Sequence, residues 1–214
     1  KWYIETCRRL APLTLEINQL KAEKNAVILT HSYVDPEIVY GVGDFKGDSY
    51  YLSAQARDAG ADVILFAGVV FMAETAKILS PEAKVLVPDR NSGCTLADSL
   101  DGEELRRLKG LFPDAAVVCY INSTAEVKAE SDVCVTSSNV YDIVESLPER
   151  QILFVPDRLM ADNIRAEMRA RGVDKDIISS DGTCVVHEEF TAEQVTEARR
   201  QFPGLKIAAH PECT

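Results

Sequence analysis

Apolar and polar positions alternate along this chain in blocks that predict short strands separated by helices. Apolar runs of four to six residues, such as 26–30 and 62–67, are typical of strands buried on both faces of a parallel sheet. Runs with helical periodicity lie between them, for example Leu159 to Ala170 and residues 192–201. This succession predicts an α/β protein built from parallel sheets covered by helices. We expect the leading residues 1–24 to be helical and 206–209 to form the last strand.

Three of the strands end in a similar way. Strand 26–30 is followed by His31-Ser32-Tyr33, strand 117–119 by Tyr120-Ile121-Asn122, and strand 206–209 by His210-Pro211-Glu212. The first polar members lie 89 and 90 residues apart (120 − 31 and 210 − 120). A constant spacing of this kind indicates an internal repeat. Gly93-Cys94 and Cys184 keep the same spacing, and Pro88-Asp89-Arg90 is echoed, at a shorter distance, by Pro156-Asp157-Arg158.

The repeat predicts a domain organisation with short parallel sheets in three-layer αβα domains. We expect a first repeat over residues 1–110, including the leading helix, and a second over 111–203. Residues 204–214 then form the first strand of a third repeat that the sequence does not continue.

Composition narrows the class of function. The chain has 214 residues and a net charge of −11, which opposes nucleic-acid binding through a general positive field. The sequence has neither an apolar run long enough for a membrane span nor a signal-peptide pattern, so we expect a cytoplasmic protein without membrane contact. Its six cysteines are then expected to be free, metal-bound or catalytic.

The cysteines differ in their surroundings. Cys94 follows Gly93 near an expected helix start at Leu96, where a thiolate is favoured. Cys119 and Cys134 lie within apolar strands and are expected in the core. Cys184 and His187 resemble half of a zinc site, but the second pair of ligands that such sites need is missing from the sequence.

Several hydroxyl and imidazole groups are expected at strand ends, where parallel α/β sheets bind ligands. Ser49 precedes an expected helix and is suited either to capping it or to binding an anion. Ser137 ends the strand that follows Tyr120 and Asn122. His31 and His210 are two of only three histidines, and their equivalent positions favour a functional role.

These motifs together resemble the quinolinate synthase family from about residue 15 to the end. The resemblance is carried by the following segments: His31–Tyr33, Gly47–Ser49, Phe71–Ala76, Gly93–Cys94, Thr136–Asn139, Gly182–His187 and His210–Cys213. It implies three pseudo-symmetric α/β domains around a cavity, with a four-iron four-sulfur cluster whose fourth iron is open to substrate. Cys94 and Cys184 match two cluster ligands, and the third is expected in the missing C-terminal domain.

The resemblance also implies a reaction and a set of roles. Iminoaspartate and dihydroxyacetone phosphate are condensed to quinolinate in de novo NAD biosynthesis, with a functional link to an L-aspartate oxidase or dehydrogenase. The implied catalytic residues are Tyr33, Tyr120, His210 and Glu212; the implied substrate-binding residues are His31, Ser49, Tyr120, Asn122, Ser137, His187, His210 and Glu212. Two other readings stay open: a non-catalytic two-lobed module that binds a small anion, and a mononuclear zinc lyase.

Overall fold

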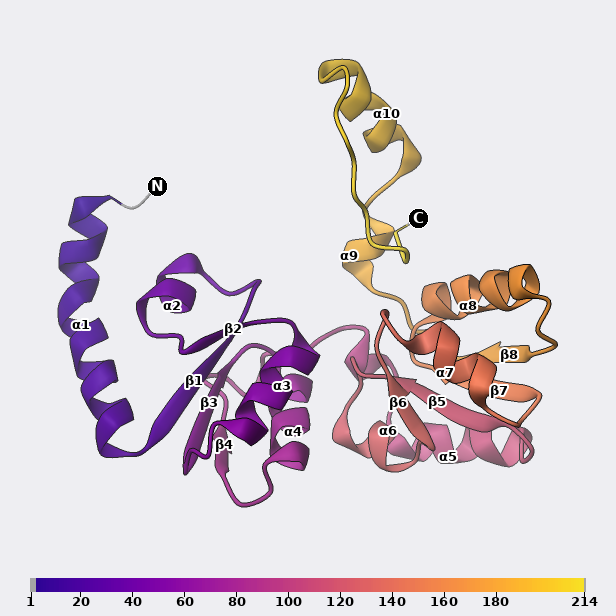
Figure 1. Ribbon diagram of the computed structural model, residues 1–214, viewed down its shortest axis with the longest axis horizontal. Helices are drawn as coiled ribbons and strands as arrows, with labels where there is room; N and C mark the ends of the chain where they lie inside the picture. Colours follow the sequence, from indigo (N-terminus) through magenta and orange to yellow (C-terminus); the bar gives the residue numbers. More distant parts are fainter. Residues whose placement is uncertain (1–2, 214) are drawn as a thin grey trace. The chain divides into compact units, whose positions relative to one another are not determined.

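The computed structural model describes residues 3–213 and divides the chain into two compact units. Unit 1 runs to Cys94 and unit 2 begins at Thr95. Each unit contains one four-stranded parallel sheet with helices between its strands (Figure 1). The α/β class and the internal duplication predicted from the sequence are therefore confirmed.

Unit 1 follows the expected succession of helices and strands. Its elements are α1 (Ile4–Glu23), β1 (Ala26–His31), α2 (Pro36–Gly41), β2 (Phe45–Gly47), α3 (Ser49–Asp58), β3 (Val63–Ala67), α4 (Val70–Leu79) and β4 (Lys84–Leu86). The strands lie in the order β2-β1-β3-β4. Helix α3 packs on α4, whose buried face includes Phe71, Met72 and Ala76.

Unit 2 repeats this succession. Its elements are a 3₁₀ turn η1 (Ala97–Ser99), α5 (Gly102–Leu111), β5 (Ala116–Tyr120), α6 (Ala125–Ala129), β6 (Val133–Val135), α7 (Val140–Ser146), β7 (Gln151–Val155), α8 (Arg158–Arg171), β8 (Asp176–Ser179), α9 (Val185–Glu188) and α10 (Ala192–Gln201). The strand order β6-β5-β7-β8 matches that of unit 1 position by position. Helix α10 projects away from the sheet of its unit (Figure 1).

The strand register shows that the two units are equivalent at the level of single residues. His31 pairs with Gly47 in unit 1, and Tyr120 pairs with Val135 in unit 2. Ser49 and Ser137 each lie two residues beyond those partners (49 − 47 and 137 − 135). The sequence spacing therefore corresponds to real structural equivalence of His31 with Tyr120 and of Ser49 with Ser137.

The central strands form the core of each unit because parallel strands covered by helices are buried on both faces. All five residues of β5 are buried, and Phe66 in β3 and Phe154 in β7 are fully buried. On one face of the second sheet, Val117 and Cys119 pack with Leu153 and Val155 against Leu105 of α5. Helix α5 accordingly belongs to unit 2, whereas the sequence analysis placed residues up to 110 in the first repeat.

Three local expectations from the sequence were wrong. The helix expected from Leu96 to Leu105 is a 3₁₀ turn followed by α5, which starts only at Gly102 because Asp101 caps it through the N–H of Glu104. Residues 206–209 form no strand, since no neighbouring strand is available to pair with them among the described residues. The two Pro-Asp-Arg segments are not equivalent, because one follows β4 and the other follows β7.

Side-chain caps fix where several helices begin. Asp48, and not Ser49 as expected, caps α3 by accepting from the N–H of Tyr51, and Ser49 is the first helical residue. Thr191 and Gln194 form a capping box at the start of α10. Among the described residues, none of the helices combines the length and apolar character needed to cross a bilayer.

Candidate active site

The side chains of the candidate site gather where the last part of unit 2 folds back onto α8. His187 lies on the short helix α9, which starts at Cys184, and His210 and Glu212 lie in the irregular segment that follows α10. Asn163 of α8 holds this segment by donating a hydrogen bond from Nδ2 to the carbonyl of Pro211. The returning segment is thereby tied to the helix that packs on the sheet.

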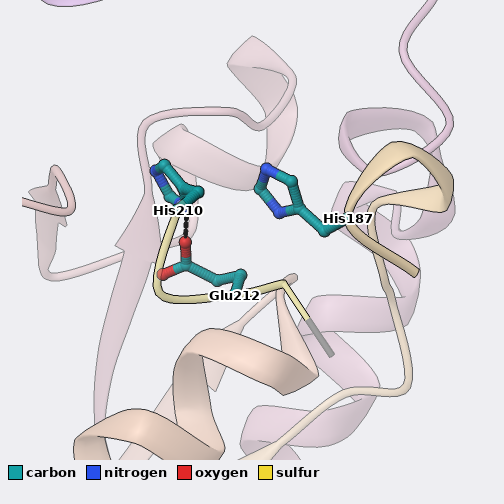
Figure 2. A group of neighbouring side chains, drawn as sticks. All are labelled: His187, His210 and Glu212. Carbon is teal, nitrogen blue, oxygen red and sulfur yellow. Dashed lines mark ion pairs between the residues drawn. The ribbon is translucent and has the colours of Figure 1, made fainter. Parts of the chain in front are cut away.

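Figure 2 shows the three side chains converging on one point. The imidazole rings of His187 and His210 are stacked, with centroids 4.7 Å apart and planes 19° from parallel. His210 Nδ1 forms an ion pair with Glu212 Oε2. One donor atom from each of the three residues falls within 4.8 Å of the others, and this is the single such group of potential metal ligands among residues 3–213.

Two polar atoms of this cluster are buried, although His210 is exposed and His187 only half-buried. Glu212 is only 3% exposed, and neither its Oε2 nor His187 Nδ1 has a partner with hydrogen-bond geometry in the described part of the chain. Buried polar atoms without such partners are uncommon in native structures. The cluster is therefore suited to receive a polar ligand.

Asp157 adds a buried carboxylate close to the two imidazoles. It is fully buried, and its Oδ1 accepts from the N–H groups of Leu159 and Met160 at the start of α8, while Oδ2 has no hydrogen-bond partner within residues 3–213. Burial raises the pKa of Asp157, and the two N–H groups and the nearby His187 and His210 oppose that rise. The sequence does not single out Asp157, because its Pro-Asp-Arg segment is recognisable there only as an echo of residues 88–90.

The segment before Cys184 packs too closely for any side chain at Gly182. A Cβ there would lie 2.5 Å from the carbonyl oxygen of Pro156 and would also collide with Ser99. The N–H of Arg158 donates to the carbonyl of Gly182 across the same contact. This close approach fixes the start of the loop that carries Cys184 and His187.

The remaining candidate residues of unit 2 are spread along the carboxyl ends of β5 and β6. Tyr120 is buried and its carbonyl accepts from Ser123 Oγ, Asn122 is half-buried, and Ser137 is exposed. The loop carrying Ser137 is closed by a 2.7 Å hydrogen bond from the N–H of Thr136 to Asn139 Oδ1.

In unit 1 the candidate residues lie at the ends of β1 and β2. His31 is buried, its ring makes an edge contact with Tyr33 at 4.6 Å, and its Nδ1 accepts from the N–H of Tyr33. Burial lowers the pKa of His31, and Asp48 opposes the shift. Tyr33 itself is 93% exposed, and Ser49 is buried.

Comparison with known proteins decides the family. The family model described as quinolinate synthetase A protein matches residues 15–214. The chain belongs to the quinolinate synthetase A family. The quinolinate synthase of Caulobacter vibrioides is 47% identical over 207 residues, which cover 95% of this chain and 55% of that protein.

Other relatives in the quinolinate synthetase A family give the same result. Quinolinate synthase 2 of Mesorhizobium japonicum is 48% identical over 197 residues, covering 92% of this chain and 59% of the relative. The quinolinate synthase of Xylella fastidiosa is 47% identical over 197 residues, covering 92% of this chain and 57% of the relative. The chain therefore spans little more than half the length of the relatives that it matches.

Family membership raises the question of whether the thiols suit an iron–sulfur cluster. Cys94 and Cys184 are half-buried and lie after the fourth strand of their respective units, β4 and β8. Thiolates are the usual ligands of such clusters, so this pair fits in kind and in repeat position. A zinc site built on Cys184 and His187 would need both residues in one cluster of possible ligands. Among the described residues, the cluster that contains His187 does not include Cys184.

Proposed function

We propose that this chain provides two of the three repeats of a quinolinate synthase, which condenses iminoaspartate with dihydroxyacetone phosphate to quinolinate and releases phosphate and water. The observation that carries the proposal is the cluster that half-buried His187 and exposed His210 form around the buried Glu212, in a chain of the quinolinate synthetase A family. A substrate with two carboxylates and a phosphate requires hydrogen-bond donors, which imidazoles and hydroxyls provide.

Cys94 and Cys184 would hold a four-iron four-sulfur cluster together with a third cysteine from a further repeat. Such a cluster would supply Lewis-acid chemistry for the elimination of a hydroxyl group. The equivalent positions of the two thiols after β4 and β8 support this assignment.

His210 and Glu212 are suited to holding a proton beside the substrate. Burial, and secondarily the neighbouring His187, lowers the pKa of His210, while Asp157 opposes that shift. His210 Nδ1 pairs with Glu212 Oε2, and a neutral His210 keeps one ring nitrogen as an acceptor. We infer that Glu212 exchanges protons with the intermediate, and that Tyr33 and Tyr120 contribute hydroxyl groups to the same proton transfers.

Ser49 and Ser137 are proposed to anchor the anionic groups of the substrates. They occupy equivalent places two residues past the register partners of His31 and Tyr120. His31, Asn122 and His187 would complete the binding groups. The iminoaspartate would come from an enzyme that oxidises aspartate, in line with a link to an aspartate oxidase or dehydrogenase.

Iron and sulfide content after anaerobic reconstitution tests the proposal. We expect Cys94→Ala and Cys184→Ala to lose bound iron and sulfide, whereas Cys7→Ala, which removes an exposed thiol on α1, should keep the content of the unsubstituted chain. A chain of these 214 residues should bind the cluster more weakly than one that also supplies a third thiol. Full iron retention in Cys184→Ala would contradict the assignment, and phosphate binding without any iron would favour a non-catalytic anion-binding module.

The role of Glu212 is tested separately in a chain that carries all three repeats. Glu212→Gln keeps the shape of the side chain but removes its capacity to take a proton, so the rate should fall by about 10²-fold or more with the cluster retained. Tyr33→Phe should act in the same way, and the two losses should not add if the residues act as one unit. Unchanged rates in both variants would rule out this pair as the acid–base groups.

A further inference from the structure

Cys119 and Cys134 lie directly opposite each other on neighbouring strands. They are register partners between β5 and β6. Paired residues of adjacent strands are about 4.8 Å apart and project from the same face of the sheet. That separation falls within the Cα–Cα range of about 4.4–6.8 Å that a disulfide spans.

The two thiols differ sharply in their surroundings. Cys119 is fully buried and packs against Val155 and Leu105. Cys134 is exposed, because β6 is an edge strand of its sheet. The sequence expectation that both residues belong to the core is therefore wrong for Cys134, since an apolar strand at the edge of a sheet still leaves side chains accessible to solvent.

Contact between the thiols favours ionisation of the exposed one. Interaction with the neighbouring Cys119 thiol, and secondarily the charge of Lys128, lowers the pKa of Cys134 to about 7. The same interaction, together with burial, raises the pKa of Cys119, whose Sγ donates to the carbonyl of Tyr120. Cys134 therefore carries an accessible thiolate near neutral pH, where an ordinary cysteine is only a few per cent ionised.

We propose that Cys134 is an oxidation site for hydrogen peroxide and that Cys119 is the thiol that resolves it to a disulfide. The Cys134 thiolate attacks one peroxide oxygen and the O–O bond breaks. Sulfur is oxidised to sulfenic acid, and the other oxygen leaves as water after taking up a proton. The Cys119 sulfur then attacks the sulfenic sulfur, the S–O bond breaks, and the Cys119 proton leaves with the hydroxide as water. Two thiols and one peroxide give one disulfide and two waters.

The pair is a feature of unit 2 alone. Thr30 and Lys46 are the register partners at the equivalent position of unit 1, and neither is a thiol. The linkage would join two strands next to the candidate site, since Cys119 directly precedes Tyr120 and Cys134 lies three residues before Ser137 (137 − 134). This inference is independent of the proposed reaction, because it rests on the register and the surroundings of the two thiols.

Peptide mapping after peroxide treatment tests the linkage directly. Trypsin cleaves after Lys109, Lys128 and Arg150, so Cys119 and Cys134 fall in separate peptides, residues 110–128 and 129–150, each with one cysteine. After exposure of the reduced 214-residue chain to hydrogen peroxide, we expect these peptides to be recovered as one disulfide-linked pair that separates on reduction. The proposal is wrong if Cys134 stays reduced, or if either thiol pairs mainly with another cysteine.

Variants separate the two roles. Cys134→Ser removes the accessible thiol and should leave Cys119 reduced under the same treatment. Cys119→Ser should stop the reaction at the sulfenic acid, trapped by dimedone on residues 129–150. Cys7→Ser, which removes an exposed thiol on α1, should leave the linkage unchanged.

Alkylation of Cys134 by iodoacetamide measures the ionisation independently. The rate should rise with pH around a midpoint near 7. Lys128→Met should slow alkylation at neutral pH severalfold by removing a nearby positive charge, and Lys128→Arg should restore the rate. Dimedone labelling of Cys134 in the unsubstituted chain as strong as in Cys119→Ser would rule out Cys119 as the resolving thiol.

Discussion

Unit 1 and unit 2 share one topology but carry different residues at the ends of equivalent strands. After β3 the chain passes through Gly68 and Val69 into α4, whose N-terminus has no side-chain cap. After β7 it passes through Asp157, whose carboxylate caps α8 and lies near two histidines. Duplication thus supplied two copies of a scaffold, and the chemistry of each copy depends on the few residues placed at its strand ends.

The largest expected effect on stability comes from a feature that both units share, a buried phenylalanine in the equivalent strands β3 and β7. Phe66 and Phe154 are fully buried in the equivalent strands β3 and β7, so truncation to Ala should cost about 3–5 kcal/mol of stability in each case. Phe202→Ala makes the same chemical change at a side chain that is 61% exposed and should change the free energy of unfolding by less than about 0.5 kcal/mol. Urea unfolding measures all three variants. A loss at only one of the two buried positions would break the structural equivalence.

An intermediate effect concerns the cap present in one unit only. Asp157→Ala removes the acceptor of two N–H groups at the start of α8 and should cost about 0.5–2 kcal/mol in thermal unfolding. Val69→Ala, at the equivalent position before α4, removes no side-chain cap and should cost less.

The charge of Asp157 is tested by a second variant. Asp157→Asn keeps an acceptor for the cap but cannot ionise. Because burial raises the pKa of Asp157, the unsubstituted chain should lose stability relative to Asp157→Asn as the pH rises from about 3.8 through the raised value. A stability difference that does not change with pH would show that the carboxylate is not held in a desolvated site.

The features that these variants probe differ in how far the sequence alone predicts them. The repeat, the central strands and the equivalence of His31 with Tyr120 followed from spacing and apolar periodicity, since both are local properties of the chain, whereas the strand expected at 206–209 did not form. The convergence of His187 with His210 could not be obtained in that way, because it depends on how the segment after α10 folds back onto α8. Asp157 was missed for a related reason, as burial of a carboxylate is a property of tertiary packing.

The smallest expected effect on stability comes from His31, because its equivalent in unit 2, Tyr120, does not ionise near neutral pH. His31 occupies the place that Tyr120 takes in unit 2, and burial lowers its pKa. The folded state then binds a proton less readily than the unfolded state. The stability that His31 contributes should be complete above about pH 6.5 and be lost as the pH falls through the lowered value.

His31→Asn keeps an acceptor near the position of Nδ1 and should flatten this part of the pH profile. The difference between the unfolding free energies of the variant and the unsubstituted chain isolates His31 from the other two histidines. An identical pH profile in both would mean that His31 titrates normally.

Helix α10 has a complete capping box but no buried residue, whereas α8 has four. A helix of 10 residues held only by its own hydrogen bonds is marginal in water, since most helix stability comes from tertiary packing. Its amide hydrogens should therefore exchange with solvent deuterium through local opening. Those of α8 should exchange much more slowly, because their exchange requires opening of the packed core. The segment that carries His210 and Glu212 back to α8 thus follows a helix that we expect to open independently of the packed core.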